Sequence, residues 1–222
     1  MDTIVEKVGL YDILGVFLSG MFFIVFSLLL NVPLNRVIEI TDNDSINVFI
    51  FILLGIFSGI ILQEISSVID KKLFKFREKA RVNFLNYNNA VFNNDLELRS
   101  YRKLANKILR LNKNSTYIYS HYENEYVFFY CKTYLETHGA GNKINLINAL
   151  YAMSRSFILS IPLCTVLYLR FNTISSDSCE FITILIFCSL LTWLFYNRTK
   201  RYAFYRVRVL LRYYKTIKES HP

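Results

Sequence analysis

An all-α membrane protein is the fold class that this sequence predicts, and two observations predict it. Hydrophobic residues make up 53% of the 222 residues, and most of them are collected in four blocks. The blocks come in two pairs, and a long basic and aromatic stretch separates the pairs. Because about 20 apolar residues in a helix cross the ~30 Å hydrocarbon core of a bilayer, we expect four transmembrane helices in two hairpins, with a helical cytoplasmic region between them.

The first hairpin is predicted from two nearly uncharged segments. Residues 10–30 form an apolar run of sufficient length, whose one charge, Asp12, stands near its start. Residues 48–65 are almost as apolar, and Gln63 and Glu64 fall at their end. Polar side chains at such an end reach the lipid headgroups or a neighbouring helix, so both segments are expected to span the membrane.

The second hairpin is predicted from residues 156–169 and 181–196. The first of these segments is short and Pro162 interrupts it, so it spans comfortably only if the helix continues upstream through residues 146–153. Arg155 would then reach the membrane surface or pair inside the protein. The alternative is a re-entrant or surface helix. Residues 181–196 are uncharged and end in an aromatic and basic group that is typical of a membrane interface.

The distribution of Lys and Arg predicts the orientation. Loops 31–47 and 170–180 each hold one arginine and more acidic than basic residues. Residues 71–81 and 198–212 each hold six Lys or Arg. Because basic loops stay in the cytoplasm, both termini and the central region are expected there. The predicted domains are a first transmembrane hairpin (1–69), a cytoplasmic helical domain (70–155), a second transmembrane hairpin (156–197) and a basic cytoplasmic tail (198–222).

An amphipathic basic helix is predicted within the central region. Between residues 99 and 111, apolar residues recur at helical spacing and cations cover much of the remaining surface. This face is either simply solvated or binds anionic lipid headgroups, a partner or a phosphate-bearing ligand. The candidate ligand-, partner- or lipid-binding residues are Arg99, Arg102, Lys103, Lys107 and Arg110, together with Arg155.

A second helix is expected over residues 116–137, with Ser115 as its N-cap. It is rich in Tyr and Phe, but its three glutamates would repel a phosphate backbone and so argue against direct nucleic-acid binding. Packing in the core, between subunits or at a membrane interface is the preferred explanation of its aromatic residues. The tail either lies along the inner leaflet or packs on the central helices.

Small residues four apart mark one face on each of three apolar segments. Gly55 and Gly59 form a G-x-x-x-G unit, which lets helix backbones approach closely. Such faces either pack the helices of one chain or, in an oligomer, join subunits or line a water-filled pathway. The candidate helix-packing or pore residues are Gly15, Ser19, Gly55, Gly59, Gln63, Ser156 and Ser160.

No enzyme, metal or cofactor is predicted. The sequence contains no P-loop, G-x-S-x-G or H-E-x-x-H motif, and its four cysteines include no C-x-x-C unit. A lipid-modifying enzyme would require His121, His138 or Glu64 to converge at the inner leaflet. Active transport is disfavoured because the ionisable residues of the apolar segments fall near predicted segment ends.

Two short segments carry a resemblance to a class of known proteins. They are Tyr11-Asp12-Ile13-Leu14-Gly15, followed by Gly20, and Leu150-Tyr151-Ala152-Met153-Ser154-Arg155. With the layout of the chain, they resemble small four-span membrane proteins of bacterial antiviral-defence loci, which include candidate pore-forming effectors and CRISPR-associated membrane accessory proteins. The R-x(4–6)-H ribonuclease motif of some accessories is absent here.

The resemblance implies an oligomeric inner-membrane effector that perturbs or permeabilises the membrane in antiviral defence. Its expected partners are membrane lipids, further copies of the chain, and a cytoplasmic signalling partner or nucleotide ligand. The alternative is a non-conducting membrane scaffold or regulator that recruits a cytoplasmic partner.

Overall fold

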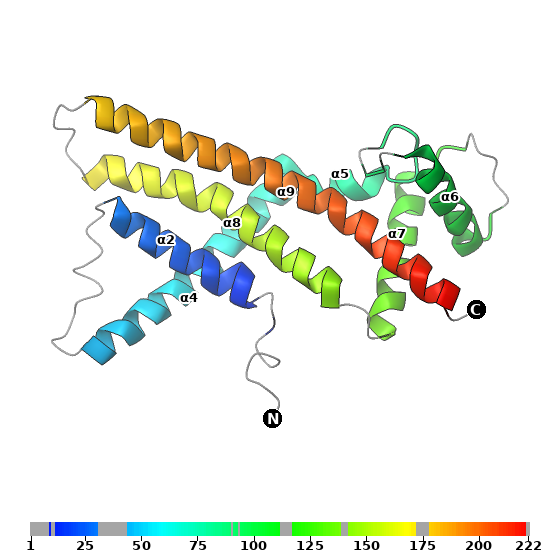
Figure 1. Cartoon of the computed structure of the whole chain (residues 1–222), viewed down its shortest axis with the longest axis horizontal. Helices are drawn as coiled ribbons and strands as arrows, with labels where there is room; N and C mark the ends of the chain where they lie inside the picture. The colour runs from blue at the N-terminus through cyan, green and yellow to red at the C-terminus, as the bar shows by residue number, and fades with distance from the viewer. Residues whose placement is uncertain are drawn as a thin grey trace. The chain divides into compact units, whose positions relative to one another are not determined.

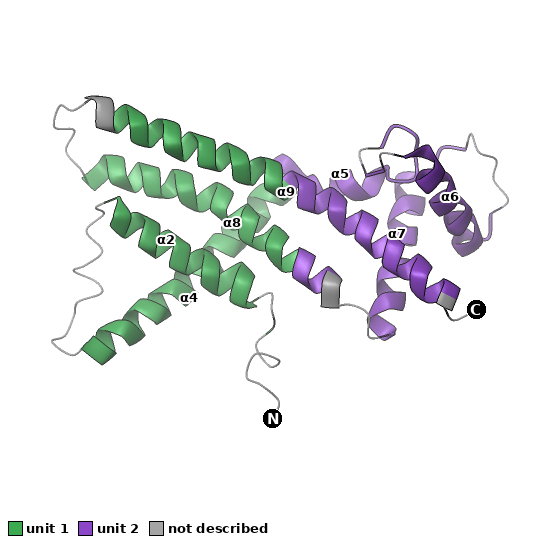
Figure 2. Cartoon of the chain, viewed as in Figure 1, with its two compact units in different colours: residues 1–72, 148–199 green, residues 73–147, 200–222 purple. Residues whose placement is uncertain are grey.

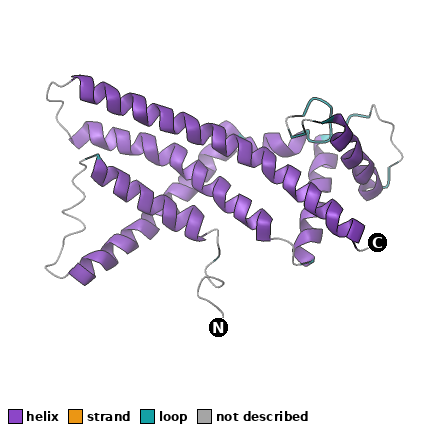
Figure 3. Ribbon diagram, viewed as in Figure 1, coloured by secondary structure: helices purple, strands orange, loops and turns teal. Residues whose placement is uncertain are grey.

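A computed structural model describes residues 9, 12–30, 44–89, 91–92, 94–111, 117–138, 142–171 and 178–220. All regular elements within these residues are helical (Figure 3), as the predicted all-α class requires. Most of the two loops predicted to face outward lies outside the described residues. In chain order the elements are η1 (Asp12–Phe17), α2 (Leu18–Leu29), α4 (Asp44–Ile69), η2 (Asp70–Phe74), α5 (Phe76–Val82), α6 (Asp95–Leu109), α7 (His121–Thr137), α8 (Asn142–Phe171) and α9 (Ser178–Ser220).

Four helical stretches are long and apolar enough to cross a membrane, namely Asp12–Leu29, Asp44–Phe74, Ile144–Phe171 and Phe181–Glu219. Each predicted apolar segment lies on one of them. Helix α8 runs unbroken from Asn142 and contains Pro162, so the predicted upstream extension of the third segment is confirmed. The chain therefore has the helices of a four-span membrane protein.

The chain divides into two compact units (Figure 2). Unit 1 comprises Met1–Lys72 and Asn148–Thr199, and unit 2 comprises Leu73–Ile147 and Lys200–Pro222. Three helices, η2, α8 and α9, continue across the boundaries between the units. Helix α9 has 43 residues (Figure 1). At 1.5 Å per residue it is about 65 Å long, roughly twice the thickness of a bilayer core, so at ordinary tilt only about half of it fits within the core.

Helix α8 is the central helix of unit 1. In the most apolar stretch of α8, 61% of the residues are buried. The corresponding shares for the first, second and fourth candidate spans are 33%, 17% and 6%. The ring of Phe157 shows the arrangement, because its centroid lies 4.3 Å from that of Phe22 on α2 and 4.7 Å from that of Phe195 on α9. Large apolar side chains of α4 and α9, such as Phe57 and Trp193, remain exposed where lipid would cover them.

Unit 2 has its own core, built around Phe84, Leu85, Phe128 and Leu135, which are fully buried. Phe84 and Leu85 lie in the segment between α5 and α6, so their backbone needs hydrogen-bond partners away from water. Asn124 supplies one, since its Oδ1 accepts from the Leu85 amide at 3.0 Å. Polar side chains therefore allow this irregular segment to be buried.

Helix α7 begins at His121, so the predicted start at residue 116 is wrong. Ser120 Oγ accepts from the Glu123 amide at 3.3 Å, and Glu123 Oε2 accepts from the Ser120 amide at 2.7 Å. This capping box is the S-x-x-E pattern of a helix start. The predicted cap, Ser115, lies outside the described residues. Tyr119 precedes the helix, and its backbone N–H and C=O pair with the side-chain amide of Asn86 at 2.9 and 3.1 Å.

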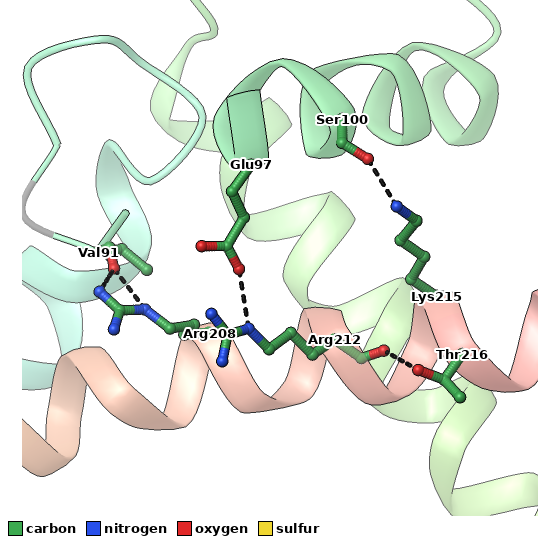
Figure 4. A network of polar contacts seen from close by, with 7 residues as sticks. All are labelled: Val91, Glu97, Ser100, Arg208, Arg212, Lys215 and Thr216. Carbon is green, nitrogen blue, oxygen red and sulfur yellow. Dashed lines mark hydrogen bonds and ion pairs between the residues drawn. The ribbon is translucent and has the colours of Figure 1, made fainter. Parts of the chain in front are cut away.

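The C-terminal part of α9 packs on the central residues of unit 2, the second of the two placements considered for the tail. Figure 4 shows its polar contacts. Arg212 Nε donates to Glu97 Oε1 at 2.8 Å, and Lys215 Nζ donates to Ser100 Oγ at 2.9 Å. Arg208 Nε donates to the Val91 carbonyl at 2.8 Å. The basic tail is thus part of a folded unit.

Candidate functional site in unit 1

Glycines make the crossing between the first two spans. A Cβ atom on Gly20 would lie against the Gly55 carbonyl and 2.6 Å from the Gly59 nitrogen. A Cβ atom on Gly59 would lie against the Val16 carbonyl. Real Cβ atoms essentially never come within 3.0 Å of such neighbours. The G-x-x-x-G face of α4 is therefore occupied by η1 and α2 of the same chain, and Gly20 is the partner residue that the sequence reasoning did not include in this face.

A buried polar cluster follows this crossing along the second span, in the C-terminal direction. It is formed by Gln63, Ser66, Asp70, Tyr151, Arg155 and Ser156. Arg155 is at its centre and is 4% exposed. Its Nε donates to Ser66 Oγ at 3.1 Å, and its Nη2 donates to Gln63 Oε1 at 2.9 Å. Gln63 Nε2 in turn donates to the Gly15 carbonyl. The polar cluster thereby links η1, α4 and α8.

Asp70, at the start of η2, and Tyr151, on α8, extend the polar cluster toward the end of the second span. The Tyr151 hydroxyl donates to a carboxylate oxygen of Asp70, and both side chains are buried. The Arg155 guanidinium carbon lies 5.8 Å from the centroid of the Tyr151 ring. The turn of π-helix η2 begins at Asp70, and such turns recur at functional positions in helices. The Asp70–Tyr151 contact was not predicted from the sequence.

The polar cluster holds helices together by directional contacts. Buried ionisable groups in membrane segments are costly and face the interior of a bundle, where they mark functional positions. A hydrogen bond to a charged group contributes about 1.5–3 kcal/mol. Among the described residues no group of three or more His, Cys, Asp or Glu could hold a metal ion. The polar cluster is therefore suited to fixing the contact between α4 and α8. A rearrangement of its hydrogen bonds would release that contact.

The predicted helix-packing residues are all buried in unit 1 of a single chain. Ser19 Oγ on α2 donates to the Gly15 carbonyl on η1 at 2.5 Å, within the first span. Ser156 Oγ lies 3.5 Å from Ser66 Oγ, and Ser160 Oγ donates to the Phe157 carbonyl at 3.5 Å. Ser27 Oγ, which the prediction did not include, lies 3.2 Å from Cys164 Sγ and adds a contact between the first and third spans.

The predicted binding residues separate into two groups. Arg99, Lys103 and Lys107 are exposed on α6, and Arg110, its C-cap residue, is also exposed. Arg155 belongs to the polar cluster, so its prediction as a lipid- or ligand-binding residue is corrected to an internal partner. Arg102 is corrected in the same way, because it is 5% exposed. Its Nη1 donates to the Leu85 carbonyl at 2.8 Å and its Nη2 to the Tyr117 carbonyl at 2.5 Å.

We expect Arg102→Met to destabilise unit 2, with little effect from Lys103→Met at the next position. The Arg102 guanidinium satisfies two carbonyls and lies 4.8 and 4.9 Å from the rings of Tyr87 and Tyr119. Leaving such buried acceptors unpaired costs about 1–3 kcal/mol. Thermal unfolding of the detergent-solubilised chain, followed by helix content, measures the difference. Equal unfolding midpoints for the two variants would contradict this role.

The histidines do not converge. His121 begins α7 and His138 follows its last residue, so the helix separates them. Glu64 lies exposed on α4. His121 and His138 therefore do not lie close together, as a lipid-modifying enzyme that used both would require.

Cys131, on α7, is expected to resist thiol reagents in the folded chain. It is fully buried, and burial raises the pKa of its thiol to about 12 from an ordinary value of 9.0, while Lys218 opposes the shift. Because the unfolded thiol loses its proton first, this residue's contribution to stability is intact below pH 9 and is lost as the pH rises toward 12. Maleimide labelling at pH 8, followed by peptide mass spectrometry, should modify Cys131 only after unfolding. Thr133→Cys, an exposed position on the same helix, is the control that should react in the folded chain.

Fold and site define an all-helical protein with four candidate membrane spans and a buried polar cluster that joins three of them. No family model, curated protein or solved structure matches the chain.

Proposed function

We propose that the chain is an inner-membrane effector of bacterial antiviral defence that assembles into oligomers and perturbs or permeabilises the membrane. The observation that carries the proposal is the position of the polar cluster. The polar cluster lies on α4, η2 and α8. Helix α8 extends directly into unit 2, and α4 is continued into unit 2 by η2. A signal received by unit 2 is thereby connected, through unbroken helix, to the polar residues inside unit 1. The resemblance of residues 11–15 and 150–155 to proteins of defence loci supports the biological context.

The proposed topology places unit 2 in the cytoplasm and the four spans in two hairpins. Unit 2 holds 19 of the 26 Lys and Arg residues but only 7 of the 17 Asp and Glu residues. This excess supports a cytoplasmic location for unit 2 and for both termini, because basic segments are retained on that side.

In the proposed mechanism the polar cluster holds the resting state. Arg155 keeps α8 against α4, and the glycine crossing keeps α4 against α2. When unit 2 rearranges, α8 and the continuous α4–η2 helix transmit the movement and the contacts of Arg155 open. The freed polar groups then face neighbouring copies or water, which lowers the barrier of the membrane to ions. Packing of Gly55 and Gly59 within one chain implies that copies associate through other faces.

Membrane potential in a bacterial host tests this proposal. We expect Arg155→Met and the milder Tyr151→Phe to depolarise cells in the absence of any trigger, because each removes a contact that holds the resting state. Arg170→Met, which removes an exposed arginine from the same helix, should leave the potential intact. Variants that fold, insert and preserve the potential would overturn the proposal. A leak that is equal for all three variants would also overturn it.

The alternative function, a non-conducting scaffold, is favoured by a different observation. Helix α7 exposes an aromatic ridge formed by Tyr122, Tyr126, Phe129 and Tyr130. Exposed apolar patches of this kind mark protein-binding surfaces. Native mass spectrometry separates the two functions, since a ring of copies favours the effector and a monomer or closed dimer favours the scaffold.

A further inference from the structure

We propose that α6 carries a second membrane-contacting surface, which binds anionic lipid headgroups. The surface consists of Arg99, Lys103, Lys107 and Arg110, the cationic stripe, with Leu96 at one end. The proposal does not depend on the effector function, because either a pore or a scaffold could use such a surface.

The cationic stripe runs along one face of α6 and ends at the C-cap residue, Arg110. Arg99, Lys103 and Lys107 are spaced by four residues, so they lie above one another on the helix. All four are exposed, and none of the four side chains forms an ion pair with another described residue. From Arg99 to Lys107 the stripe extends about 12 Å at 1.5 Å per residue.

The acidic side chains of unit 2 are largely engaged elsewhere. Glu97 pairs with Arg212 at 2.8 Å, and Glu136 pairs with Lys132 at 3.3 Å. Glu125 and Glu219 lie 3.7 Å from Arg81 and Lys215. Asp95, four residues before Arg99 on α6, lies on the same helix face as the cationic stripe. One carboxylate cannot neutralise four cations, so an external anion is needed as the counter-charge.

Helix α6 cannot turn this face inward without losing its core contacts. Leu98, Tyr101 and Ala105 on the opposite face are 2%, 4% and 0% exposed. Asn94 caps the helix, since its Oδ1 accepts from the Leu96 amide at 2.9 Å. The orientation of the cationic stripe is thus fixed by the fold of unit 2.

A lipid surface fits the cationic stripe better than the other polyanions. Leu96 is 72% exposed and lies on the same face, and a cationic helix face with an apolar residue at its edge is suited to the headgroup region. The stripe contains no aromatic residue on which nucleic-acid bases could stack. Three covalent connections tether unit 2 to the membrane-spanning unit, which keeps the effective concentration of lipid high.

An environment-sensitive fluorophore on the full chain tests the assignment. The probe is placed by Leu96→Cys, which retains all four cations, and the protein is reconstituted in nanodiscs of neutral or anionic phospholipid. Cys131, Cys164 and Cys188 are buried. Cys179, the fourth cysteine, is replaced by serine in every variant, and the labelled Cys179→Ser chain serves as the blank. We expect a blue shift in anionic nanodiscs only. Raising the salt from 0.1 to 1 M should reverse it, because the Debye length falls from about 10 Å to about 3 Å.

Two controls make the result specific. Changing all four cations of the stripe to glutamine should abolish the shift, and a probe at the exposed position Thr133 on α7 should not respond. The same emission in both lipids would overturn the proposal. A shift that survives both the glutamine changes and high salt would also overturn it. A shift in neutral nanodiscs on adding inorganic phosphate or a single-stranded RNA oligonucleotide, without one in anionic nanodiscs, would replace lipid by that ligand.

Discussion

Gly20→Leu is expected to lower the free energy of unfolding of the membrane unit by about 3 kcal/mol or more, since overpacking at a close contact costs 1–3 kcal/mol even where side chains yield. Here the obstacles are backbone atoms, namely the Gly55 carbonyl and the Gly59 nitrogen. Neither can move aside without displacing α4 from α2. Separation of these two helices would in turn remove the Gly15 carbonyl from Gln63 and so weaken the polar cluster.

Reversible unfolding in mixed detergent micelles measures this effect. Val25→Leu provides the matched control, because it adds a methylene to an exposed position of the same helix and should change stability little. Gly20→Ala should fall between the two, because it places only the Cβ atom into the contact. If Gly20→Leu unfolded at the same detergent fraction as Val25→Leu, the close crossing of α2 and α4 would not exist in the folded protein.

Composition and hydropathy were sufficient to predict the four apolar helices. Their length is imposed by bilayer thickness, so each leaves a local signal in the sequence. The small-residue faces were also visible, because a spacing of four places residues on one helix face whatever the partner is. The identity of the partner was not predictable. Nothing local to Gly55 specifies that Gly20 lies across from it.

Arg102 shows a different kind of failure. Its residue type matches that of the exposed cations beside it, but it lies four residues after Leu98 and three before Ala105, both of which are buried. Its position therefore belongs to the apolar face of α6. The helical period predicts a buried site there, but an arginine suits it only because the carbonyls of Leu85 and Tyr117 come within reach in the folded unit.

The start of α7 was missed although its signal is local. Residues 117–119 continue the apolar and aromatic pattern of the helix, but the S-x-x-E sequence that begins at Ser120 marks the actual helix start. The polar cluster has no comparable local signal. Arg155 and Gln63 are 92 residues apart, and only the packing of α8 on α4 brings them together.

Arg155→Met is expected to cost about 3 kcal/mol, because it leaves Gln63 Oε1 and Ser66 Oγ without their donor in a site that excludes water. Methionine retains much of the length and apolar contact of the side chain, so the loss reports the polar contacts. Arg170→Met removes a charge from the exposed end of the same helix and should cost little. The measurement is again unfolding in mixed micelles.

A double-mutant cycle with Gln63→Leu identifies the contact itself. If Arg155 and Gln63 act as partners, the two substitutions together should cost less than the sum of the single effects, by about 0.5–3 kcal/mol. The Gln63→Leu variant alone also removes the donor to the Gly15 carbonyl, so it should weaken the α2–α4 crossing as well. Strict additivity would mean that the Arg155 side chain does not contact Gln63. In that case the connection between α4 and α8, on which the proposed resting state depends, would have to be made by the contacts of Ser66 with Arg155 and Ser156, together with the Asp70–Tyr151 contact.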